Sequence, residues 1–266
     1  MDEQTAVMAA RLELRFEQNV LDFVTRQTAN GVSLDDRGEH RIRLAEELRV
    51  ILHDVSVQID DKKSVVDLMY KFGNDLYEIG ELSLSRQCME EALKQTDNIT
   101  PEIESIASRI SIVLFLSLCT KKEVLMNSCV HISPMMLSKL LKTVEQIREM
   151  LDLIFTRTTK EQENFSHLIL NSAKVIYDIG QPMIWWNCGK YVIDSLMFAA
   201  ICMDAVINLC TMRHMTFRLK LYSSAFYAAL IQGKRGSTGD FLKCCRHLFP
   251  FFPPFSQAHQ MKLRQY

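Results

Sequence analysis

Residues 69–92 read MYKFGNDLYEIGELSLSRQCMEEA and predict two antiparallel helices joined by a tight turn. Apolar residues recur at helical spacing on both sides of that turn. Gly73 and Ser85 allow the helices to approach closely, Gly80 makes the turn, and Ala92 leaves room for a further helix. These positions match the packing residues of a tetratricopeptide repeat, although an ordinary helical hairpin shows the same features.

The same periodicity continues on both sides of this hairpin, and no stretch predicts a convincing strand. Helices are expected over about 4–28, 39–58, 63–79, 82–96, 101–120, 134–157, 159–179, 190–211, 215–231 and 239–248. In the second of these, a buried stripe is expected over Ile42, Leu44, Leu48, Ile51 and Val55. We therefore expect an all-α fold, an antiparallel helical array of about nine or ten helices in tetratricopeptide-like helix–turn–helix hairpins.

Three segments are expected along the sequence: acidic N-terminal helices over 1–60, the helical array over 61–248, and a basic tail rich in Phe and Pro over 249–266. Local signals mark some helix ends. Ser133 followed by Pro is a typical helix start, and Thr159 with Gln162 resembles a capping box. Gly180-Gln181-Pro182 is expected to end a helix.

Composition is that of an average soluble globular protein, with 48% hydrophobic and 24% charged residues. The net charge of −1 gives no global argument for nucleic acid or an anionic membrane. The charge is nevertheless uneven, because residues 1–100 hold 20 acidic and 12 basic residues, whereas 211–266 hold nine basic residues and one acidic residue. Such polarity suits a part that docks against neighbours of opposite sign, or two solvated faces of an independent protein.

The eight cysteines are expected to be reduced thiols in the cytosol, because the first twenty residues lack the apolar run of a signal peptide. Val192–Cys210 is the most apolar window of the sequence. Asp194, Asp204 and Asn208 interrupt it, so that a buried helix is expected there and no membrane span.

No motif selects an enzyme, a metal or a cofactor. The basic loop Gly233–Gly239 lacks the strand and the residue order of a phosphate loop. Two Cys/His clusters lack the paired spacing of structural zinc. They comprise Cys129 with His131, and Cys244 and Cys245 with His247. The protein is therefore expected to be non-enzymatic, with no cofactor.

Trp185 and Trp186 form the most prominent aromatic pair. Tryptophan is enriched at interface hot spots, which makes the pair a candidate partner contact. The favoured alternative is that one ring packs in the core and the other covers a helix end.

Residues 191–222 resemble the N-terminal helical region of the cilia- and flagella-associated protein 54 family. The similar segments read YVIDSLMFAAICMD (191–204), LCTMR (209–213), TFR (216–218) and LY (221–222). The family-like positions are Cys202, Met203, Arg213, Thr216, Arg218 and Tyr222. Departures from the family pattern are Asp204 for Glu, Phe217 for Trp, and His214-Met215 for Tyr-Leu. Arg218 is a candidate ion-pair partner of Asp194 or Asp204.

The resemblance implies a non-enzymatic scaffold of the ciliary or flagellar axoneme, in a projection of the central-pair apparatus, that supports assembly and motility. It implies other projection proteins and calmodulin as partners, indirect microtubule association, and a place in the cytoplasm, cytoskeleton and axoneme, without nucleic acid or membrane. The basic, apolar stretch 212–231 suits a calmodulin target and equally core packing. The alternative function is a cytosolic tetratricopeptide-like adaptor that binds a peptide or protein.

Overall fold

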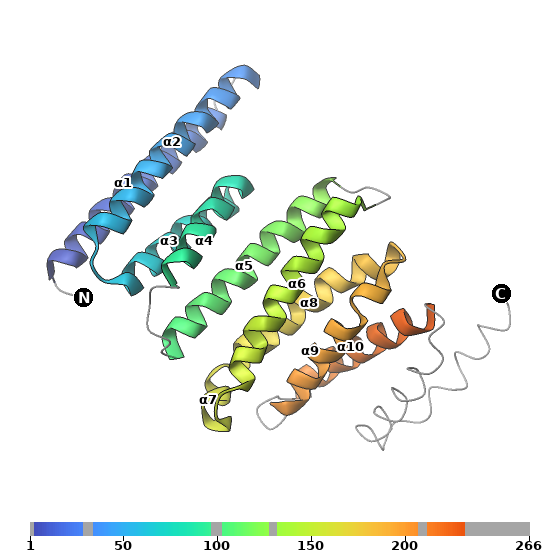
Figure 1. The fold of residues 1–266 in the computed structure, drawn as a ribbon. Coiled ribbons are helices and arrows are strands. Elements are labelled where there is room, and N and C mark those ends of the chain that lie inside the picture. The colour runs from blue at the N-terminus through green and yellow to red at the C-terminus, as the bar shows by residue number, and fades with distance from the viewer. Residues whose placement is uncertain (1–2, 29–33, 97–102, 128–131, 207–211, 232–266) are drawn as a thin grey trace. The chain divides into compact units, whose positions relative to one another are not determined.

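A computed structural model describes residues 3–28, 34–96, 103–127, 132–206 and 212–231 (Figure 1). Within these ranges the protein forms ten α-helices and one 3-10 helix, and it has no strand. The elements are α1 (Glu3–Thr28), α2 (Leu34–Gln58), α3 (Lys62–Glu78), α4 (Leu82–Thr96), α5 (Ile103–Asn127), α6 (Pro134–Phe155), α7 (Thr159–Asn164), α8 (Ser166–Trp185), η1 (Gly189–Tyr191), α9 (Ile193–Ala205) and α10 (Met212–Ile231). The all-α prediction is confirmed, whereas the tetratricopeptide-like character of the hairpins stays a prediction.

The protein divides into two compact units, residues 1–179 and 180–266, with α8 running across the division. In the first unit one apolar core extends from α1 to α5. Phe16 of α1 stacks on Phe72 of α3, with ring centroids 4.0 Å apart. Tyr77 of α3 meets Phe115 of α5 edge to face at 5.2 Å. The N-terminal helices therefore share their core with the hairpin that follows, while the segment boundaries expected at 60 and 248 stay predictions.

The buried stripe of α2 differs from expectation at one position. Leu44, Leu48, Ile51 and Val55 are buried, but Ile42 is 62% exposed. A helix turns by about 100° per residue, so Ile42 lies about 200° away from Leu44 on the opposite face. The expectation of a buried Ile42 was wrong because it does not follow the stripe's spacing.

The α3–α4 hairpin brings its small residues into close contact. A Cβ at Gly73 would lie 2.6 Å from Cε of Met89. The Ser85 hydroxyl donates to the carbonyl oxygen of Gly73 at 2.6 Å, so this short approach also satisfies a buried polar group. Gly80 has φ +90°, which lets the backbone reverse between the helices, and Ala92 is fully buried.

Among the described helices, α3, α6 and α7 have side-chain caps at their starts, and the first is capped by Asp61. Ser133 has extended backbone and its hydroxyl accepts a backbone N–H of the first turn of α6. The capping box at α7 is formed by Thr158 and Glu161, not by Thr159 and Gln162 as predicted. Thr158 is the residue with extended backbone, so its hydroxyl is the one placed to accept the N–H of Glu161.

The predicted helix end at 180–182 is also wrong, because α8 continues to Trp185. A Cβ at Gly180 would lie 3.2 Å from Cδ2 of Leu196 in α9. Gly180 therefore permits close helix packing within the second unit and makes no turn. The helix ends just before Asn187, whose φ of 58° lies in the left-handed region.

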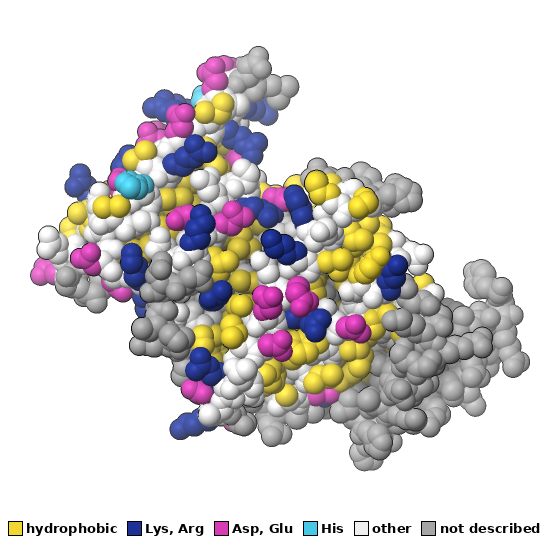
Figure 2. Space-filling model, viewed as in Figure 1, with side chains coloured by type: hydrophobic (Ala, Val, Ile, Leu, Met, Phe, Trp, Pro, Cys, Tyr) yellow, Lys and Arg dark blue, Asp and Glu magenta, His cyan; other side chains and the backbone are white. Residues whose placement is uncertain are grey.

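Several expectations fall on residues that the structure does not describe. These are the helix over 239–248, the tail 249–266, the loop Gly233–Gly239 and the cysteine–histidine clusters around 129 and 244. Among the described helices, none combines the length and apolarity required to cross a bilayer. On the face that Figure 2 shows, described side chains of both charge signs are interspersed.

Candidate functional site

A buried arginine joins the last two described helices. Arg218 of α10 is 1% exposed, and its Nε donates to Oδ1 of Asp204 in α9 at 2.7 Å. Its Nη2 forms an ion pair with the same oxygen. Of the two candidate acids, the structure selects Asp204, whereas Asp194 is exposed.

Tyr222 completes this group of side chains. Its hydroxyl donates to Oδ2 of Asp204 at 2.5 Å, so both carboxylate oxygens accept. Arg218 and Tyr222 are four residues apart and therefore lie on the same face of α10. Nη1 of Arg218 also contacts Sδ of Met215 at 3.3 Å. We name Asp204, Arg218 and Tyr222 the Asp204 cluster.

The charges of the Asp204 cluster favour a fixed contact between α9 and α10. The side chain of Arg218 is 2% exposed and that of Asp204 is 17% exposed, so both charges are largely removed from water. A buried charge is costly unless a partner compensates it. Here each charge compensates the other and the tyrosine supplies a further donor. The cluster can therefore hold α9 against α10 at one distance and one rotation.

The remaining family-like residues do not converge on the cluster as a site. Cys202 and Met203 are buried in α9, and Thr216 is exposed on α10. The side chain of Arg213 lies outside the described residues. Among the described side chains of the predicted set, Arg218 and Tyr222 both bind Asp204.

Small residues bring the other elements of the second unit onto α9 and α10. Ala199 and Ala200 of α9 are fully buried, as are Ala225 and Ala228 of α10 to within 1%. A Cβ at Gly189 would lie 3.2 Å from Cβ of Ala228, which places η1 directly against α10. The Asp204 cluster thus lies within a closely packed group of helices.

The tryptophan pair is divided between solvent and protein. Trp185, at the end of α8, is 82% exposed, and Trp186 is partly buried. Tyr191 at the end of η1 is 47% exposed, with Nζ of Lys190 4.6 Å from its ring centroid. Because large exposed aromatic rings are typical of interface hot spots, Trp185 is the stronger candidate contact of the two.

Sequence analysis did not predict the side-chain contacts of two residues, Met215 and Lys190. Met215 contacts Arg218 through a thioether sulfur, which no spacing or composition signal distinguishes from an ordinary apolar residue. Nζ of Lys190 lies over the ring of Tyr191, its neighbour in sequence, within the 3-10 helix η1.

Comparison with known proteins bears on the second half of the sequence. The family model described as Cilia- and flagella-associated protein 54 matches residues 103–236, just over half of the 266 residues. This segment contains α5 to α10, and with them the Asp204 cluster and Trp185. No curated protein matches the sequence. The similarity noted over 191–222 lies wholly within the matched segment.

Proposed function

The chain belongs to the cilia- and flagella-associated protein 54 family, and we propose that it is a non-enzymatic scaffold of the axoneme, in a projection of the central-pair apparatus. The family associates it with cilia or flagella. The observation that carries the proposal is the match over 103–236, which includes the whole of the Asp204 cluster. In this role the protein supports the assembly of neighbouring projection proteins and hence motility.

The packing of the second unit supports a scaffold role. The Asp204 cluster joins α9 to α10 through buried polar contacts. We propose that Trp185 contacts a neighbouring projection protein and that microtubules are reached through such neighbours. The protein would then occur in the cytoplasm before assembly and in the cytoskeleton of the axoneme afterwards.

Calmodulin is a further partner that the family suggests, and α10 is the relevant helix. Its Leu221 and Ala225 are buried, as is Arg218. A calmodulin contact with this face would require α10 to leave the core. Partner contacts are therefore expected on exposed side chains, and α10 is expected to remain packed in the core.

The test is the location of the tagged full-length protein in a ciliated cell. After membranes are stripped with detergent, we expect the protein to stay with the axoneme and to leave only on salt extraction. In matched cells that lack the central pair, retention should be lost. Release into the detergent-soluble fraction of normal cells would contradict the proposal and favour the cytosolic adaptor.

A further inference from the structure

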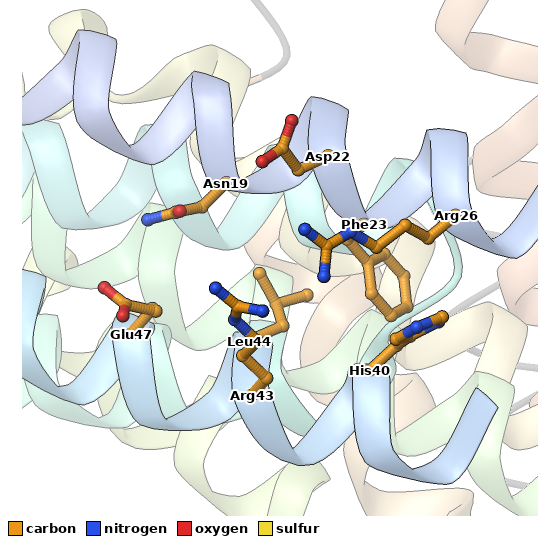
Figure 3. Close-up of a pocket in the computed structure, with 8 residues that line it drawn as sticks. All are labelled: Asn19, Asp22, Phe23, Arg26, His40, Arg43, Leu44 and Glu47. Carbon is orange, nitrogen blue, oxygen red and sulfur yellow. The ribbon is translucent and has the colours of Figure 1, made fainter. Parts of the chain in front are cut away.

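A pocket lies between α1 and α2, in the part of the sequence that precedes the family match (Figure 3). Phe23 and Leu44 form its apolar floor and are 7% and 4% exposed. Polar side chains from both helices surround them. The lining residues are Asn19, Asp22, Phe23, Arg26, His40, Arg43, Leu44 and Glu47.

Two arginines from different helices share this pocket, and within the described ranges neither forms an ion pair. Figure 3 shows the guanidinium groups of Arg26 and Arg43 in the space between α1 and α2. Another arginine of α1 is paired, because Arg15 contacts Glu47 and Asp54 at 3.2 and 3.1 Å. Asp22 and Glu47 also line the pocket, but Glu47 is paired with Arg15, so that only Asp22 remains beside the two arginines and positive charge is in excess.

Two further polar atoms in the lining lack partners. Nδ2 of Asn19 and Nδ1 of His40 are buried and have no hydrogen-bond partner among the described residues. Buried polar atoms are normally paired, because an unpaired one has given up its hydrogen bonds to water. The amide nitrogen of Asn19 can only donate, and so can both guanidiniums. Nδ1 of His40 donates when it carries the proton. In that form all these atoms are donors, and they need an acceptor.

The charge and size of the pocket restrict that acceptor. Arginine binds carboxylates through two parallel N–H donors, which suits a planar anion. Asp22 and Glu47 also line the pocket, and Glu47 is already paired with Arg15, so a multiply charged anion would meet repulsion. The free volume is about 50 Å³, enough for a few groups the size of water at about 10–15 Å³ each.

We propose that this pocket binds a carboxylate of a partner protein. The carboxylate belongs either to an Asp or Glu side chain or to the partner's C-terminus. Arg26 and Arg43 form the ion pairs, and Asn19 and His40, which lie at opposite ends of the pocket in Figure 3, offer further buried polar atoms. Both arginines are exposed, so the pocket is reachable from solvent. The inference does not rest on the proposed axonemal function, since all lining residues lie before residue 103.

The test uses the full-length protein labelled with ¹⁵N-arginine and titrated with sodium acetate, with sodium chloride added to hold ionic strength constant. We expect saturable shifts of the Nε–Hε signals of Arg26 and Arg43. Arg43→Gln should weaken apparent acetate affinity about tenfold, as expected for loss of a charge-assisted hydrogen bond. Arg49→Gln, which removes an exposed arginine of α2 outside the pocket, should leave affinity unchanged.

Two capped tripeptides then separate the possible sources of the carboxylate. One carries a single Glu with an amidated C-terminus, and the other carries only glycine with a free C-terminus. Saturation by either supports the proposal and identifies the source. Non-saturable shifts, equal shifts at all exposed arginines, or tighter binding of inorganic phosphate than of acetate would overturn it. Circular dichroism of each variant confirms that folding is intact.

Discussion

Arg218 carries a positive charge where water is almost completely excluded, and its stability contribution can be measured. Arg218→Met should destabilise the fold by about 3 kcal/mol, at the low end of the range for a broken buried ion pair. The low value is expected because Asp204 keeps the Tyr222 hydrogen bond and is 17% exposed. Urea unfolding followed by circular dichroism gives the difference in free energy.

The reverse truncation is the internal comparison. Asp204→Ala should cost more than Arg218→Met, because the side chain left unpaired is then the arginine, which is only 2% exposed. Combining both changes should cost less than the sum of the two, since the double variant leaves no lone charge. Asp194→Ala, at an exposed acid of the same helix, should have little effect. Additive losses would show that the ion pair does not couple α9 to α10.

Gly73 allows another direct test, because the side chain of Met89 fills the space that a side chain at position 73 would need. Gly73→Leu should lower stability by about 1–3 kcal/mol, the usual cost of overpacking a close helix contact. Even the first added carbon would lie 2.6 Å from Cε of Met89. Gly38→Leu is the control, because a Cβ at this α2 position meets nothing within 4 Å. Thermal unfolding distinguishes them, and equal midpoints would contradict the close contact of α3 with α4.

Helix ends make a prediction that depends on pH. Thr158→Ala removes the cap of α7 and should cost about 1 kcal/mol at neutral pH. The hydrogen bonds from Thr158 hold the pKa of Glu161 below 4.5. A carboxyl whose pKa is lowered on folding stabilises the folded protein at pH values above its ordinary pKa. That stabilisation is lost as the pH falls through the lowered pKa. The cost of Thr158→Ala should therefore shrink as the pH falls below 4.5, the ordinary pKa of this carboxyl.

Ser133→Ala is the matched control for that experiment. Ser133 caps α6 by the same kind of hydrogen bond, but no carboxylate takes part in it. Its cost should stay constant over the same acidic range in urea unfolding. A parallel decline for both variants would mean that general acid destabilisation, and not the capping box, causes the change.

The limits of sequence-based prediction are visible at individual helices. The start of α6 could be predicted because Ser133 and Pro134 act locally, through groups one turn away. The continuation of α8 through Gly180 could not be predicted, because the decisive contact is with Leu196, in a different helix. A glycine that permits close packing and one that turns the backbone look the same in sequence. Gly80, with φ +90°, is the second kind.

For the molecule as a whole, periodicity predicts which face of a helix is buried. It does not predict which other helix that face contacts. In α1 the apolar spacing runs through Leu12, Phe16 and Phe23, which are buried, and through Val20 and Val24, which are partly buried. The pocket between α1 and α2 depends on the axial offset of two helices, and no spacing within either helix specifies that offset. For the same reason the sequence did not distinguish Asp194 from Asp204 as the ion-pair partner of Arg218. The all-α class therefore followed from local patterns, while the sites required the three-dimensional arrangement.

The exposed Trp185 connects the folded protein to its place in an assembly. An 82% exposed ring contributes little to folding, so Trp185→Ala should change the free energy of unfolding by less than about 0.5 kcal/mol. Trp186→Ala should lower stability, because that ring is partly buried. If Trp185 contacts a neighbouring projection protein, its loss should release the tagged protein from stripped axonemes at lower salt. Ile201→Ala, 57% exposed on α9, controls for a general loss of apolar surface. Unchanged retention of the Trp185 variant would exclude this ring as an anchor, since a stable fold leaves loss of contact as the only effect of the substitution.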